Sequence, residues 1–141
     1  MRETGEAGAE LRREMARQLV LALLSLHKRN IVHRDIKPSN IVIHQNALLK
    51  LIDFGSAIDL SLVHNENDVD VFSRSDHSLA YEPPEFHGFD HRAPLPKSLF
   101  HPSYDSWSLG VVLLEILLGT DVRLFDFTKL FIRSHARVES L

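Results

Sequence analysis

Apolar residues recur at helical spacing over residues 10–29, which places them on one face of a helix. Charged residues fill most of the first two turns of the other face, and Asn30 is a suitable residue for the end of the helix. The preceding residues 1–9 are expected to form a flexible lead-in. The predicted core-facing stripe consists of Leu11, Met15, Leu19, Ala22, Leu23 and Leu26.

A second helix is predicted over 104–118, where apolar residues occur on nearly every face. This pattern is typical of a buried central helix, and Gly119 is placed to end it. Such a helix needs cover on each side, because otherwise a sizeable apolar area faces solvent. Residues 120–132 have enough apolar positions for a further short helix, whereas 133–141 are polar.

Two short apolar segments, about 41–44 and 48–52, predict the strands of a β-hairpin, with Gln45 and Asn46 at the turn. From 56 to about 102 the periodicity is poor, and Ser, Asp, His and Pro are frequent. We therefore predict a long functional loop in this region rather than a packed element.

The amino-acid composition and charge argue against several classes of protein. The chain of 141 residues is 44% hydrophobic and 25% charged, which is ordinary for a globular protein. Its net charge of −3 gives no basic field for nucleic acid or an anionic membrane. The longest apolar runs are too short for a membrane span, and the N-terminal residues do not resemble a secretory signal. The chain has no cysteine. We expect an intracellular protein, cytoplasmic or nuclear.

The segment HRDIKPSN at residues 33–40 carries a dense group of chemically useful side chains. Phosphoryl transfer needs an acceptor for a hydroxyl proton, a cation beside the transferred group, and oxygen ligands for magnesium. Asp35 can accept or orient the proton, Lys37 can neutralise developing charge, and Asn40 offers a carbonyl oxygen. Asp53, directly after the second predicted strand, adds a carboxylate.

Each of these residues also has an ordinary interpretation. On its own, Asp35 would be a solvated loop carboxylate, Asp53 a helix cap or a turn residue, and Lys37 a surface lysine. A zinc site is an alternative for five of the nine histidines, namely His64, His77, His87, His91 and His101. Their spacing is irregular and cysteine is absent, which argues against it. The arrangement of the motifs, rather than any one residue, favours the catalytic interpretation.

Four motifs in order resemble the eukaryotic protein kinase family. The segment 33–40 resembles its catalytic loop, and Ile52-Asp53-Phe54-Gly55 its magnesium-binding strand end. Residues 78–85 resemble the end of an activation segment, with Pro-Pro-Glu in place of Ala-Pro-Glu, and 104–110 resemble the start of the central helix. The resemblance covers residues 10–119. It implies an α+β, mostly helical partial kinase domain over 1–141, equivalent to the C-terminal lobe with a short hairpin.

The resemblance implies a serine/threonine protein kinase that uses ATP and Mg²⁺ and phosphorylates Ser/Thr of protein substrates. Lys37, Pro38 and Asn40 favour the serine/threonine branch, because tyrosine kinases usually carry Ala and Arg in this loop. The implied catalytic residues are Asp35 and Lys37, and the implied metal ligands are Asn40 and Asp53. The implied nucleotide-binding residues are Lys37, Ser39, Asn40, Val42 and Asp53.

The family pattern also implies structural and regulatory roles. Asp105 would hold the backbone of His33 and Arg34, and His33 would lie with Phe54 in one hydrophobic column. Val42 would lie under the adenine, supported by Val112 and Ile116. The implied activation segment spans 53–85, where an anion would neutralise Arg34. Candidate regulatory residues there are Ser73, Ser75 and Ser78; we expect phosphorylation of the first two to activate, and the hydroxyl of the third to touch the catalytic Asp and Lys.

The chain departs from the family pattern in two places. The glycine-rich loop, the strand Lys and the helix Glu of the N-terminal lobe are absent, so half of the implied nucleotide pocket is missing. Residues 86–101 are expected to form an inserted surface loop. We therefore expect the isolated chain to be weakly active or inactive. A non-catalytic binding or decoy module is the alternative.

Overall fold

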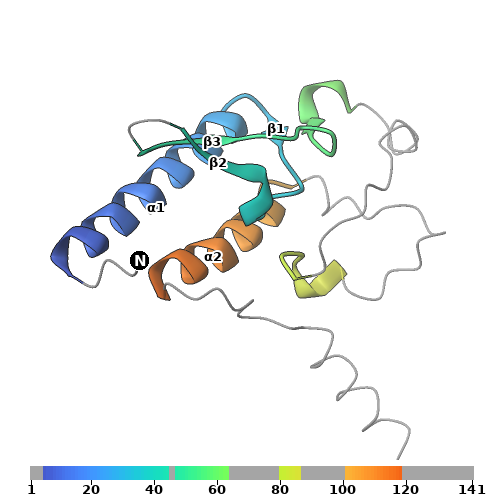
Figure 1. Ribbon diagram of the computed structural model, residues 1–141. Coiled ribbons are helices and arrows are strands. Elements are labelled where there is room, and N and C mark those ends of the chain that lie inside the picture. Colours follow the sequence, from blue (N-terminus) through green and yellow to red (C-terminus); the bar gives the residue numbers. More distant parts are fainter. Residues whose placement is uncertain (1–4, 45–46, 64–79, 87–100, 119–141) are drawn as a thin grey trace, which may run out of the picture.

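The computed structural model describes residues 5–44, 47–63, 80–86 and 101–118. Two helices, α1 (Glu6–His27) and α2 (Ser103–Leu118), pack against each other, and Figure 1 shows a β-hairpin lying across them. The chain is therefore an α+β assembly of helices and small antiparallel sheets, as the sequence predicts.

Helix α1 begins at Glu6, four residues before the predicted start, so the expectation of a flexible lead-in is wrong for residues 6–9. Glu6 and the two alanines nearby favour a helix, and an acidic side chain in the first turn suits the helix dipole. The helix ends at His27, two residues earlier than predicted. Asn30 follows with φ of 59°, a left-handed conformation that asparagine tolerates after a helix.

The predicted hairpin is confirmed as β2 (Ile41–His44) and β3 (Leu48–Leu51). The strands are antiparallel, and their register pairs Ile41 with Leu51 and His44 with Leu48. Leu49 faces the helices and is buried, because alternate residues of a strand point to opposite faces. The predicted turn residues 45 and 46 lie outside the described part of the chain.

The prediction of a long loop from 56 to 102 misses a second small sheet. Strand β4 (Ile58–Asp59) pairs antiparallel with β1 (Ile31–Val32). Two 3-10 turns, Leu60–Leu62 and Pro84–Phe86, also fall within the predicted loop. Two-residue strands show no detectable alternation, so only the tertiary pairing reveals them. Most of the predicted inserted loop 86–101 and all of the possible helix 120–132 lie outside the described residues.

The main core lies between α1, α2 and the hairpin. It contains Leu19 and Leu23 from α1, Ile36, Leu49 from β3, and Leu109 and Val112 from α2. Helix α2 also buries Tyr104 in a second, smaller cluster with Ile58 and Phe86, whereas its remaining side leaves Leu114, Leu117 and Leu118 exposed. The prediction of a fully buried helix is therefore wrong for this chain, and the expectation that uncovered sides would face solvent is confirmed. Leu11, which was placed in the core-facing stripe of α1, is also exposed.

Neither of the two described α-helices is both long enough and apolar enough to cross a bilayer.

Candidate functional site

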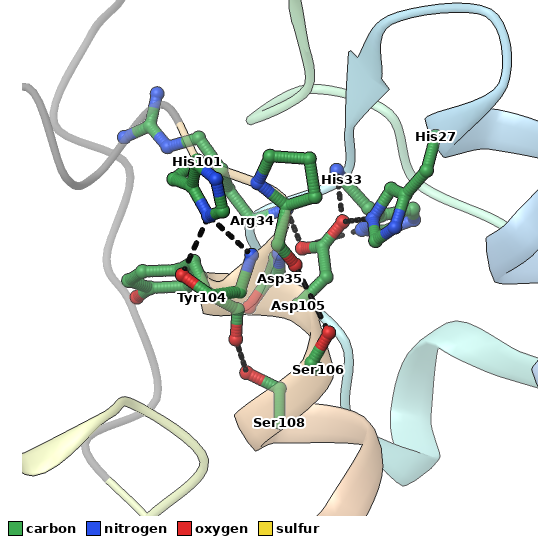
Figure 2. Close-up of polar contacts among 11 residues, drawn as sticks. His27, His33, Arg34, Asp35, His101, Tyr104, Asp105, Ser106 and Ser108 are labelled. Atoms are coloured by element: carbon green, nitrogen blue, oxygen red, sulfur yellow. Dashed lines mark hydrogen bonds and ion pairs between the residues drawn. The ribbon is translucent and has the colours of Figure 1, made fainter.

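Asp105 in the first turn of α2 holds the backbone that leads into Asp35. Its side chain is 0% exposed, and its carboxylate accepts hydrogen bonds from the backbone N–H of His33 at 2.8 Å and of Arg34 at 2.7 Å. His27 Nε2 lies 2.9 Å from the same carboxylate (Figure 2). Three N–H donors offset the burial of one charge, because a carboxylate can only accept hydrogen bonds. The predicted contact of Asp105 with this backbone is confirmed.

His33 connects the loop to the end of the hairpin. Its ring is fully buried and lies 4.9 Å from the ring of Phe54, measured between centroids, which confirms the predicted contact. The backbone N–H of Asp35 donates to Nδ1 at 3.4 Å, and Nε2 lies 3.2 Å from the carbonyl oxygen of Ile52. Since a backbone N–H can only donate, Nδ1 is the acceptor and Nε2 carries the proton.

Asp35, Lys37 and Asn40 lie together. Lys37 Nζ is 2.8 Å from Asp35 Oδ2, and both side chains are partly buried. The Asn40 amide nitrogen donates to Asp35 Oδ2 and to the Asp35 carbonyl oxygen, each at 2.8 Å. A cation and an amide therefore both contact the same carboxylate oxygen of Asp35. This arrangement presents an oriented carboxylate beside a cation at the surface.

Asp53 is connected to the group of Asp35, Lys37 and Asn40 through the residue before it, Ile52. The N–H of Ile52 donates to the carbonyl oxygen of Asn40 at 2.9 Å. Asp53 itself is exposed and adopts φ of 62°, and its Oδ1 accepts a hydrogen bond from the N–H of Gly55 at 3.2 Å. A Cβ at position 55 would also lie 3.2 Å from this oxygen, so glycine suits the close approach.

The donor set of Asn40 and Asp53 fits a magnesium ion. Mg²⁺ prefers oxygen ligands, usually one or two carboxylates with phosphate oxygens and water. Asp53 offers an exposed carboxylate. Asn40 uses its amide nitrogen for Asp35, so its side-chain oxygen is not required by that contact. The two residues therefore offer oxygen donors of the kind that Mg²⁺ binds.

Arg34 belongs to the segment 33–40, and its side chain points into the interior. Its side chain is buried, and its backbone has a φ of 67°, a left-handed conformation that the two hydrogen bonds to Asp105 help to hold. Burial lowers the pKa of Arg34, and the nearby Tyr104 and Asp105 oppose that shift. A small cavity lies here, and the residues that line it include Arg34, Asp35, Tyr81, Glu82 and Tyr104.

Helix α2 also holds the segment 80–86. Ser108 Oγ donates to the carbonyl oxygen of Tyr81 at 2.7 Å, and the Tyr81 hydroxyl donates to Glu115 at 3.1 Å. The Tyr104 hydroxyl lies 3.5 Å from Glu82 Oε1. Burial raises the pKa of both Glu82 and Tyr104. These contacts cannot be predicted from the sequence, because nothing in the spacing links residues 22 to 34 positions apart.

The remaining predicted site residues are not part of this group. Ser39 and Val42 are exposed, Val42 to 41%. Ser73, Ser75 and Ser78 lie outside the described residues. No sequence signal links His27 to Asp105.

The chain belongs to the protein kinase domain family, whose sequence pattern it matches over residues 2–129. This match covers most of the chain and includes every residue of the candidate site.

Several known kinases are similar to the chain. A probable inactive protein kinase of Arabidopsis thaliana is 37% identical over 139 residues, which covers 84% of this chain and 36% of that protein. A dual specificity protein kinase of Dictyostelium discoideum is 40% identical over 114 residues, covering 79% and 17%. A serine/threonine-protein kinase of the same organism is 39% identical over 104 residues, covering 73% and 16%. The chain thus spans about a third or less of the length of these curated relatives.

Proposed function

We propose that the chain is the C-terminal lobe of a serine/threonine protein kinase that transfers the γ-phosphate of ATP to Ser or Thr hydroxyls of proteins. The observation that carries the proposal is the group of Asp35, Lys37 and Asn40, in which Lys37 and the Asn40 amide both contact the Asp35 carboxylate. Family membership supports the reaction class. Lys37 and Pro38 support the serine/threonine branch, as does the relative described as a serine/threonine kinase.

In the proposed reaction each residue of the site has a defined role. The carboxylate of Asp35 orients the substrate hydroxyl and accepts its proton. Lys37 Nζ neutralises charge that develops on the transferred phosphoryl group. Asn40 and Asp53 bind magnesium, and Ser39 and Val42 line the nucleotide side. Bound magnesium would neutralise charge on the phosphates of ATP. Asp105 and His33 hold the backbone of the loop in place.

A nucleotide titration tests the proposal. We expect the longest native polypeptide that contains these residues to bind ATP in a magnesium-dependent manner, and Asp53→Asn to abolish the magnesium dependence. The matched control is Asp59→Asn, which changes another carboxylate that accepts hydrogen bonds from a nearby residue. ATP binding that is equal with and without magnesium, in the unaltered chain, would contradict the role of Asn40 and Asp53.

Phosphorylation of Ser73 or Ser75 would supply the anion that faces Arg34 in this proposal. Changing both serines to alanine should lower the activity of the complete enzyme. Unchanged activity would show that the regulatory part of the proposal is wrong.

A second candidate function is a non-catalytic binding or decoy module. The description of the Arabidopsis relative as a probable inactive kinase favours it, and so does the exposure of Val42 on the implied nucleotide side. The same titration separates the two functions. Tight magnesium-dependent ATP binding supports the kinase, whereas binding of a peptide without nucleotide binding supports the module.

A further inference from the structure

Gln18 on α1 contacts the backbone of the hairpin near its turn. Its Nε2 donates to the carbonyl oxygen of Ala47 at 3.2 Å, and its Oε1 accepts from the N–H of Leu49 at 2.8 Å. Both hydrogen bonds cross about thirty positions of sequence, and nothing in the helical pattern indicates them. One side chain therefore satisfies a carbonyl and an N–H of the hairpin at once.

The orientation of the Gln18 amide is fixed by its other neighbour. Nε2 also donates to Glu14 Oε1 at 2.9 Å, and Glu14 is held in turn by two hydrogen bonds from Arg17. Two acceptors face the nitrogen and one donor faces the oxygen, so only one of the two amide orientations satisfies all three contacts. The interaction of Gln18 with the hairpin is therefore directional. The packing of Leu49 from β3 against the helices is apolar and has no such direction.

The backbone that Gln18 contacts is in an unfavourable conformation. Ala47 has φ of 57°, in the left-handed region that residues with a Cβ rarely adopt. Such a conformation persists when the surroundings hold it. The hydrogen bond from Gln18 to the Ala47 carbonyl oxygen is one such constraint, and it acts one residue before β3 begins.

The other end of the same hairpin carries the candidate magnesium ligands. Asn40 directly precedes β2, and Asp53 follows β3 after one residue. Four register pairs join the strands, and the N–H of Ile52 closes this end on the carbonyl oxygen of Asn40. A tilt of the hairpin on α1 therefore moves both residues together.

We propose that Gln18 is a positioning residue that sets the place of Asn40 and Asp53 by fixing the hairpin to α1. This inference rests on the proposed function for the metal-binding role of those two residues. Gln18 itself does not touch substrate or metal in this account. It acts through Ala47, Leu49 and the pairing of β2 with β3.

Amide hydrogen exchange on the full chain tests the inference, with Gln18→Met as the variant and Arg13→Met as the control. Methionine is similar in length to glutamine but cannot make the two hydrogen bonds. Arg13 is exposed, lies on the same helix, and contacts Glu10. In Gln18→Met we expect exchange of the Ile52 amide to rise at least about fivefold, while the Leu23 amide in the core of α1 is unchanged. Arg13→Met should change neither.

Two results would overturn the inference. If only the Leu49 amide exchanges faster, Gln18 acts locally and does not position the far end. If Leu23 and Ile52 change equally, the residue contributes general stability. Gln18→Glu keeps the oxygen that accepts from Leu49, but it loses the donor to Ala47 and places a second carboxylate beside Glu14. We therefore expect a rise at Ile52 at least as large as in Gln18→Met, and no rise there would also count against the inference.

Manganese separates this inference from the proposed function. Mn²⁺ added alone should broaden the NMR signals of Asn40 and Gly55 in the unaltered chain, and Gln18→Met should weaken that binding several-fold. Absence of broadening in the unaltered chain would overturn the metal-binding role of Asn40 and Asp53. An unchanged Ile52 amide would overturn the role of Gln18, whatever manganese shows.

Discussion

The side-chain amide of Asn40 donates two hydrogen bonds to Asp35, one to the carboxylate and one to the backbone carbonyl, each at 2.8 Å. The two residues are five positions apart, and the 3-10 turn Pro38–Asn40 folds the chain back so that they meet. The carboxylate is thus oriented by its own chain. In the proposed reaction this preorganisation would contribute to catalysis, because no further ordering would be needed at the moment of reaction.

The contact of Asp105 with the loop predicts a large effect on stability. In Asp105→Asn the new amide group cannot accept all three N–H donors of His27, His33 and Arg34. Breaking a buried network of this kind costs about 2–4 kcal/mol in the free energy of unfolding. Urea unfolding measures the loss, and Asp59→Asn, which alters a contact with nearby Ser61, should change the midpoint far less. Equal midpoints for both variants would show that Asp105 does not hold the loop.

The burial of Glu82 is expected to make the stability of the chain depend on pH. Burial raises the pKa of Glu82 above its ordinary value of 4.5, so the folded chain holds this proton more tightly than the unfolded chain. The contribution of Glu82 to the free energy of unfolding is therefore present below pH 4.5 and is lost as the pH rises through the raised pKa. Glu82→Gln should remove this dependence and stabilise the chain at neutral pH. Urea unfolding at several pH values checks it, and an identical pH slope in both proteins would contradict it.

Two leucines of α1 test the position of the core. Leu19 is 1% exposed between the helices and the hairpin, whereas Leu24 is 46% exposed on the same helix. Leu19→Ala should lower the free energy of unfolding by about 3 kcal/mol, because it leaves a cavity. Leu24→Ala should lower it by less than about 1 kcal/mol. The reverse order in thermal or urea unfolding would mean that α1 packs through its other face.

The long elements could be predicted from the sequence because their periodicity is strong. The hairpin and the position of α2 follow from runs of apolar residues, and the order of the kinase-like motifs was not needed to find them. The start of α1 was misplaced because Glu6 and Gly8 give little periodic signal. The exposed side of α2 could not be located from its composition, because a helix that is apolar on nearly every face gives no sign of which side is covered.

The candidate site was predictable only in part. Asp35, Lys37 and Asn40 lie within six residues, so one turn of chain brings them together and sequence proximity is informative. The contacts of Gln18 with the hairpin and of His27 with Asp105 join distant segments, and no local pattern encodes them. Short strands such as β1 and β4 depend on the same long-range pairing.

Phosphate transfer by Asp35→Asn tests the central claim most directly. Asparagine preserves the shape of the side chain but cannot accept a proton, and general-base groups contribute about a hundredfold or more to rate. The assay follows labelled γ-phosphate of ATP onto serine and threonine of a generic protein substrate, using the longest native polypeptide that contains these residues, with Asp59→Asn as the control. We predict a loss of about a hundredfold or more in Asp35→Asn alone. Transfer at the rate of the unaltered protein would contradict the assignment of Asp35, and with it the proposed reaction site.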